Sequence, residues 1–162
     1  MVPVPIGSLL YNPVKRGYQG YTAMTGPDCF EVIPIGMIHS PYKIPKDAPR
    51  QGRFSDEESV IEIYEPFVSG LRDVEREKHL IVLYWLDRAD RTALTATPPH
   101  TGIEHGVFAT RSPHRPNPIG LSVADLVRRD NNKLVVHGLD ALDGTPVVDI
   151  KCYSPGLDCI PE

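Results

Sequence analysis

Cysteine is scarce in this 162-residue sequence, and long apolar runs are missing. The three cysteines, Cys29, Cys152 and Cys159, form no CxxC pair, which argues against a disulfide framework and a zinc knuckle and favours reduced thiols. No stretch reaches the roughly 18 apolar residues of a transmembrane helix, and the N-terminus lacks a basic start followed by an apolar core. We therefore expect a soluble, cytoplasmic protein that does not contact a membrane.

The common nucleotide-binding and hydrolase motifs are also missing. The sequence has no GxGxxG after a strand, no GxxxxGK[ST] and no GxSxG elbow. His100, His105 and His114 match no zinc-binding spacing, so we predict no metal site. A cofactor would have to be held by loops at the ends of strands.

Charge is low overall but unevenly distributed. The formal net charge of −4 gives no global sign of nucleic-acid binding. Residues 40–53 hold four basic residues against one acidic residue, residues 56–65 hold five acidic residues, and residues 111–133 hold five basic residues against two acidic ones. Two basic segments separated by an acidic one could form a local anion-binding site.

Proline, by contrast, is abundant. The 17 prolines and 13 glycines indicate a turn-rich globular chain. Residues 67–97 and 119–145 contain no proline, so these two runs should hold most of the regular structure. Five prolines fall in the 21 residues from Pro98 to Pro118, and loops of that length are usually functional or disordered.

The most unusual string within and just beyond this segment is GVFATRSPHRPNPIGLS, residues 106–122. Its prolines hold the backbone near an extended geometry, and a stiff loop loses little entropy when it binds a ligand. The polar side chains that project from it are Arg111, Ser112, His114, Arg115 and Asn117. From these residues alone, a rigid corner with surface arginines is an equally good interpretation.

Short strand patterns recur along the chain without long amphipathic helices. The predicted strands are residues 30–38 (an edge or bulged strand), 59–66, 79–87 (central and buried), 106–110, 119–130, 133–144 and 145–153. Residues 70–79 have a helical composition but span only about two turns. Turns are expected at residues 130–132 and at Asp143-Gly144, the latter a common type I′ hairpin signal.

These patterns predict an all-β, mainly antiparallel fold with short helical turns, either a small barrel or a sandwich. We expect one domain over residues 30–162. Residues 1–29 have few charges and no periodic pattern, so we interpret them as an N-terminal extension.

The chain resembles the TsaA-like family, which includes TrmO-type tRNA methyltransferases. The resemblance is carried in order by IGMIHSPYK, DAPRQG, RSPHRPNPIGLS and LDALDGTPVVDIKCY. It implies a small β-barrel, unlike the Rossmann-type methyltransferases, that binds S-adenosyl-L-methionine in a cleft near a homodimer interface. It also implies methylation of the exocyclic nitrogen of threonylcarbamoyl-adenosine beside the tRNA anticodon.

The resemblance also assigns candidate cofactor contacts. In the first basic segment, Gln51 could bond an adenine or amino-acid edge and Gly52 could allow a close backbone approach, beside Arg53. Asp87 and Arg88 end the apolar strand of residues 79–87. For these positions an ordinary charged loop or a solvated strand end is the alternative.

Two further loops complete the predicted cofactor site. Arg111 and Ser112 are the best contacts that the resemblance implies, because Arg111 could bind a carboxylate with two hydrogen bonds. Leu121 would add an apolar or backbone contact. The last predicted contacts are Ala141, Leu142, Asp143 and Gly144, whose backbone could read adenine while Asp143 meets the ribose, although a simple hairpin turn explains them equally well.

Acceptor binding and proton transfer require other residues. We predict substrate contacts at Arg50, His114, Arg115 and Asn117. The acceptor nitrogen must lose a proton, so a base is expected. Asp149, with Lys151 and Tyr153 at a spacing of two on one strand face, is the candidate catalytic group, and a structural Asp149–Lys151 ion pair is the alternative.

The sequence departs from the family pattern in three places. Thr97 and His100 flank Pro98-Pro99 where some members have arginines, Cys152 stands where proline is more frequent, and the chain ends at Glu162 without a C-terminal extension. Weaker tRNA affinity or a different substrate is therefore expected. The alternatives to a tRNA methyltransferase are a non-catalytic module that binds S-adenosyl-L-methionine or an adenosine ligand, and a small-molecule methyltransferase.

Overall fold

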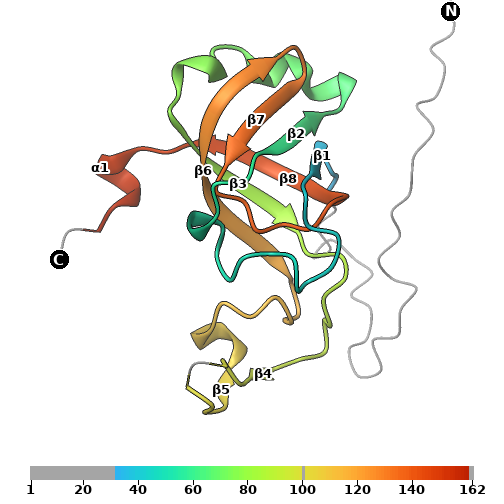
Figure 1. The fold of residues 1–162 in the computed structure, drawn as a ribbon, viewed down its shortest axis with the longest axis vertical. Coiled ribbons are helices and arrows are strands. Elements are labelled where there is room, and N and C mark those ends of the chain that lie inside the picture. The colour runs from blue at the N-terminus through green and yellow to red at the C-terminus, as the bar shows by residue number, and fades with distance from the viewer. Residues whose placement is uncertain (1–31, 100, 161–162) are drawn as a thin grey trace, which may run out of the picture. The chain divides into compact units, whose positions relative to one another are not determined.

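Six antiparallel strands close into a barrel in a computed structural model that describes residues 32–99 and 101–160 (Figure 1). Around the barrel the order is β1 (Gly36–His39), β2 (Ser59–Ile63), β7 (Lys133–His137), β6 (Ile119–Asp130), β3 (His79–Trp85) and β8 (Thr145–Cys152), which pairs again with β1. The predicted all-β, antiparallel fold is confirmed, and the barrel alternative is the one adopted. The N-terminal extension predicted for residues 1–29 lies outside the described residues.

Strand alternation explains the barrel core. On β3, Leu80, Val82 and Tyr84 are buried, and the residues between them are partly exposed. The facing positions of β6 are small, and Gly120 lies opposite Tyr84. A Cβ on Gly120 would lie 2.1 Å from Cε2 of Tyr84, so only glycine leaves room for the phenol ring at this end of the barrel.

The connections contain short turns and one small additional sheet. The 3₁₀ turns η3 (Glu65–Leu71) and η4 (Val74–Arg76) lie between β2 and β3, close to the predicted helical segment. The strand predicted at residues 106–110 is wrong. β5 (His105–Gly106) pairs only with β4 (Thr95–Ala96), and the chain then forms the 3₁₀ turn η5 (Val107–Ala109), because the amide of Thr110 donates to the carbonyl of Val107.

Two predicted turns have different outcomes. Asn131 adopts a left-handed conformation, φ 56°, in the tight turn that joins β6 to β7. Asp143-Gly144 also form a turn, with Gly144 at φ 82° and Thr145 donating to Leu142 over 3.1 Å. The hairpin prediction there is wrong, because β7 pairs with β2 and β6, whereas β8 pairs with β1 and β3.

The remaining short elements are η2 (Gly52–Phe54) and the single helical turn α1 (Pro155–Asp158). Within residues 32–99 and 101–160, no helix is long and apolar enough to cross a membrane. The segment from Gly138 to Gly144 is a crossover from β7 to β8. It matters for function because Asp140 and Leu142 line the cavity described next.

Candidate functional site

A cavity of about 480 Å³ lies at one end of the barrel. Its wall combines the loop after β1, the end of β3, the proline loop, the start of β6 and the crossover to β8. These five segments lie far apart in the sequence, and the barrel order brings them together. Because the sequence lacks glycine-rich nucleotide motifs, we expected any cofactor to be held by loops at strand ends, and this cavity is built from such loops.

Ten of the predicted site residues line this cavity. They are Arg50, Gln51, Asp87, Arg88, Arg111, Ser112, His114, Arg115, Leu121 and Leu142. The other predicted residues do not line it: Gly52, Arg53, Asn117, Ala141, Asp143, Gly144, Asp149, Lys151 and Tyr153. The fold therefore brings ten of the predicted residues together around the cavity and leaves the other nine outside its wall.

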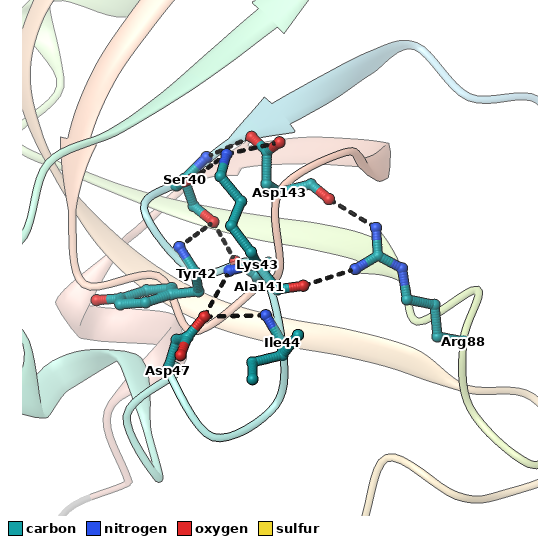
Figure 2. Close-up of polar contacts among 8 residues, drawn as sticks. All are labelled: Ser40, Tyr42, Lys43, Ile44, Asp47, Arg88, Ala141 and Asp143. Carbon is teal, nitrogen blue, oxygen red and sulfur yellow. Dashed lines mark hydrogen bonds and ion pairs between the residues drawn. The ribbon is translucent and has the colours of Figure 1, made fainter.

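Asp143 holds the cavity loops together (Figure 2). One carboxylate oxygen, Oδ2, lies 2.9 Å from Nζ of Lys43, and the other accepts the backbone N–H of Ser40 over 3.2 Å. The Asp143 carbonyl accepts from Nη2 of Arg88 over 2.8 Å. The hydrogen bond from Lys43 holds the pKa of Asp143 below its ordinary value. Asp143 and Arg88 thus join the β1 loop, the β3 end and the crossover.

The loop that carries Gln51 is fixed by further short contacts. Oδ2 of Asp47 accepts the backbone N–H groups of Lys43 and Ile44 over 3.0 and 3.1 Å (Figure 2). Gly52 is buried, and a Cβ there would lie 2.0 Å from the carbonyl oxygen of Gly138. The close approach that requires glycine at this position is therefore to the protein's own backbone.

Ser40 makes a comparable connection on the buried side of the loop. Its hydroxyl donates to the carbonyl of Ala141 over 2.8 Å (Figure 2), and the side chain of Ala141 lies in the core at 1% exposure. Ala141 therefore contributes to packing behind the cavity wall.

Within the proline loop, Arg115 is bound to the loop backbone. Its Nη2 donates to the carbonyls of Val107 and Thr110 over 2.7 and 2.6 Å, and its Nε donates to Ser112 over 3.0 Å. Three such bonds rigidify the loop and leave only the two N–H donors of Nη1 of Arg115 for a ligand. The sequence predicted a stiff loop from its prolines, and these hydrogen bonds add to that stiffness.

Arg111 and His114 are two side chains of the proline loop that retain donors. Among the described residues, Arg111 makes one long hydrogen bond, 3.5 Å from Nη2 to the carbonyl of Leu121. Nδ1 of His114 accepts the backbone N–H of Asp90 over 2.9 Å, so the neutral ring carries its hydrogen on Nε2. Both side chains line the cavity with donors available.

A buried polar cluster that the sequence did not reveal also lines the cavity. The hydroxyl of Tyr84 donates to Oδ1 of Asp140 in a short hydrogen bond and lies 3.0 Å from Oγ of Ser122. Burial, and then the nearby Asp140 charge, raise the pKa of Tyr84 well above its ordinary value, so the phenol stays neutral. The one available signal was a tyrosine on the inward face of an apolar strand.

The predicted catalytic group lies on the other side of the β8 strand. Nζ of Lys151 and Oδ2 of Asp149 form a 2.5 Å ion pair whose side chains are 59% and 44% exposed. This pairing raises the pKa of Lys151. The ring of Tyr153 packs edge-on against His79 with centroids 5.9 Å apart. The structural ion pair that the sequence left open is present, and the catalytic role stays a prediction.

No group of three or more potential metal ligands occurs in the described part of the chain. His100 lies outside the described residues.

The fold is a small, non-Rossmann barrel with a cavity built from loops at one end. Residues 37–159 match the model of the tRNA-methyltransferase O N-terminal domain, and the chain belongs to this family. The family predicted from the sequence motifs is thereby confirmed.

Similar proteins include two from Archaeoglobus fulgidus. One, named "S-adenosyl-L-methionine-binding protein", is 54% identical over 78% of this chain and 91% of its own length. The other, named "Probable S-adenosyl-L-methionine-binding protein", is 63% identical over 78% of this chain but only 34% of its own length. A crystal structure of TrmO from Pseudomonas aeruginosa matches with a TM-score of 0.68 and 36% identity, over 82% of this chain and 59% of that one. The chain thus spans about a third of the second relative and less than two thirds of TrmO.

Proposed function

We propose that this protein is an S-adenosyl-L-methionine-dependent methyltransferase that acts on threonylcarbamoyl-adenosine in tRNA. The observation that carries the proposal is the cavity, because residues assigned to the cofactor from three of the family motifs and from the end of β3 line the same wall. Membership of the tRNA-methyltransferase O family supports methyl transfer, and the name of the Archaeoglobus fulgidus relative supports binding of S-adenosyl-L-methionine.

The cavity suits the chemical groups of the cofactor. The polar edge of Gln51 and the apolar side chains of Leu86 and Leu142 can surround an adenine ring, and Arg111 can bind the methionine carboxylate. When bound, S-adenosyl-L-methionine supplies a methyl group on a positively charged sulfur. The fastened loops would hold donor and acceptor in line, and such orientation can supply a large part of the rate enhancement in a methyl transfer.

The charge of the cavity wall suits an anionic acceptor. Four arginines and two aspartates line it, leaving an excess of positive charge. A threonyl carboxylate or tRNA phosphates would satisfy that excess. Arg50 and the Nε2–H of His114, which line the cavity, are the proposed acceptor contacts. Arg115 and Asn117 would act by shaping the loop.

Proton transfer from the acceptor nitrogen is assigned to Asp149, with Lys151 and Tyr153. Asp149→Asn should then remove turnover while cofactor affinity stays unchanged, because the amide cannot accept the proton. Unchanged turnover would leave the group with only the structural role that its exposed ion pair describes.

A homodimer is the proposed assembly. The outer face of β6 presents the half-exposed side chains of Ile119, Leu121 and Val123 in one row, and Ile119 and Leu121 also line the cavity. A second copy packed on this row would lie beside the cavity mouth. Sedimentation of the wild type against Val123→Lys tests this proposal, since a lysine in a buried row should yield monomers.

The activity is tested by nucleoside mass spectrometry of tRNA incubated with protein and cofactor. One added methyl on threonylcarbamoyl-adenosine is the expected product. Unchanged tRNA together with tight cofactor binding would instead favour the second candidate, a non-catalytic S-adenosyl-L-methionine-binding module. The position of Asp149 outside the cavity wall is the observation that favours this second candidate.

A further inference from the structure

We infer that two exposed phenylalanines beside the cavity, Phe54 and Phe108, are stacking platforms for the bases on either side of the nucleotide that is methylated. This inference rests on the proposed function, because it needs an acceptor within a single-stranded stretch of RNA. It deepens that function by naming the groups that hold the acceptor strand. Neither ring is among the predicted site residues, and neither lines the cavity itself.

The two rings are exposed to an extent that a third phenylalanine is not. Phe54 is 71% exposed and Phe108 is 84% exposed. Phe67, the remaining phenylalanine of the described residues, packs against the barrel core. A phenyl ring left in water forgoes the burial of a large apolar surface. Two such rings next to the segments of one cavity wall therefore indicate a partner that covers them.

Phe108 lies in a turn that is held at both ends. It is the middle residue of η5, which follows β5 in the part of the chain that extends beyond the barrel (Figure 1). Val107, before it, is buried, and Thr110, after the turn, lines the cavity. Arg115 donates to the carbonyls of both residues over 2.7 and 2.6 Å. A ring on so rigid a turn loses little entropy when a base stacks on it.

Phe54 has the same arrangement on another segment. It is the last residue of η2, and its N–H donates over 3.0 Å to the carbonyl of Gln51, which lines the cavity. Gly52, at the start of the turn, is buried. Oγ of Ser55, after the turn, lies 2.5 Å from the hydroxyl of the buried Tyr42. Each phenylalanine is thus presented by an anchored 3₁₀ turn next to a segment of the cavity wall.

The charge beside the rings favours RNA as the partner. Four arginines and two aspartates line the cavity. Proteins bind single-stranded RNA by stacking its bases on aromatic rings and by placing cations along its phosphates. A small-molecule acceptor would occupy the cavity and leave both rings in water. A second copy of the chain is already assigned to the aliphatic row on β6, which contains neither ring.

The two platforms should contribute unequally. Three exposed acidic residues, 56–58, follow Phe54 on the way to β2. Such carboxylates repel a phosphate backbone. The first charged residue after Phe108 is instead Arg111, which lines the cavity. We therefore expect the larger loss of RNA affinity from substitution of Phe108.

The inference is tested by fluorescence anisotropy with a synthetic RNA hairpin whose single-stranded loop contains threonylcarbamoyl-adenosine. Phe108→Leu removes the flat ring but keeps an apolar side chain, and Phe108→Trp restores a ring. We expect the leucine variant to bind about tenfold more weakly and the tryptophan variant to bind within about twofold of the wild type. Phe54→Leu should weaken binding about fivefold. Leu157→Ala, at a residue that is 85% exposed and outside the cavity lining, is the matched control and should bind as the wild type does.

Two further readouts separate stacking from other roles of the ring. The slope of log Kd against log salt concentration should be the same for the wild type and Phe108→Leu, because stacking releases no counterions. The affinity for S-adenosyl-L-methionine should also be unchanged, because the ring lies outside the cavity lining. A shallower slope or weakened cofactor binding would mean that the substitution disturbs the cavity wall, and would contradict the inference.

A double-mutant cycle identifies the stacked base. Hairpins that lack the base on the 5′ or the 3′ side of the modified adenosine are titrated with the wild type and Phe108→Leu. One of these hairpins should bind the wild type about tenfold more weakly, and the leucine substitution should then cause no further loss. Additive losses with both hairpins would overturn the inference.

Other outcomes would overturn the inference in different ways. Equal hairpin affinity of the wild type and both leucine variants would overturn it and leave the proposed function intact. Weaker RNA binding by Phe108→Leu together with dissociation into monomers in sedimentation would mean that a second copy covers the ring. A wild type that binds S-adenosyl-L-methionine but not the hairpin would overturn the tRNA acceptor of the proposed function along with the inference.

Discussion

Two carboxylates on either side of the barrel wall, Asp140 and Asp149, have opposite surroundings. Asp140 lines a cavity, is hydrogen-bonded by a buried phenol, and has only neutral partners. Asp149 lies on the outside in an exposed ion pair with Lys151. The sequence motifs favoured Asp149 as the catalytic group, whereas the fold places Asp140 among the cofactor candidates. The two carboxylates therefore differ in burial and in the charge of their partners, and these two properties decide which of them can meet a ligand in the cavity.

The largest effect is expected for a substitution of Arg111, which lines the cavity. Arg111→Ala should cost about 2–4 kcal/mol of transition-state stabilisation, because a carboxylate of the ligand loses its bidentate partner. The ratio kcat/KM for tRNA methylation measures this cost. Arg53→Ala, an exposed arginine outside the cavity lining, is the control. A loss of only a few tenths of a kcal/mol would mean that Arg111 is an ordinary surface charge that binds no ligand carboxylate.

A smaller effect concerns the packing that brings the cavity loops together. Gly52→Ala should destabilise the fold by about 1–3 kcal/mol, because its Cβ would meet the backbone of Gly138 and force the two segments apart. Urea unfolding measures this change. Gly70→Ala is the matched control, since a Cβ there meets nothing within 4 Å. Equal stability of the two variants would contradict the close approach.

The fastening of the loops by Asp143 should depend on pH. Its pKa in the fold is lowered, so its contribution to stability is present above the ordinary value of 3.8 and is lost as the pH falls through the lower folded pKa. The partly exposed pair with Lys43 limits this contribution to about 1 kcal/mol or less. Urea midpoints from pH 6 down to pH 2 should therefore fall less for Asp143→Asn than for the wild type. An identical decline would mean that Asp143 does not fasten the loops.

The smallest effect is expected for the ion pair of Asp149 and Lys151 on the outside of the barrel. Lys151→Met should change the free energy of unfolding by less than about 1 kcal/mol, because exposed ion pairs contribute little. Thermal and urea unfolding give this value. A loss of several kcal/mol would show that the outer pair stabilises the barrel, and the contrast with the cavity side would then weaken.

Much of the fold could be predicted from local patterns. The proline-free run that contains residues 119–130 became β6 with the same bounds, because alternating side chains and the absence of proline specify a strand directly. Asp143-Gly144 form the predicted turn, but the strands on either side of it do not pair as the predicted hairpin. A turn depends on a few residues, whereas strand pairing depends on which distant strands close the barrel.

Site residues with a clear motif could be predicted from the sequence. Residues whose importance comes from their burial in the fold could not. Arg111, Ser112 and Gln51 were found from their motifs and lie at the cavity. Tyr84 and Asp140 were missed, because the local signals were weak: a tyrosine on the inward face of an apolar strand, and an aspartate beside the residues chosen from the LDALDG motif. Their chemistry arises only when β3 and the crossover meet.

Calorimetric titration of the wild type and Arg111→Ala with S-adenosyl-L-methionine tests the central claim most directly. The account predicts a Kd below millimolar for the wild type and binding weakened by about tenfold or more in the variant. Wild-type binding weaker than millimolar, or equal affinity in the two proteins, would contradict the assignment of the cavity as the cofactor site.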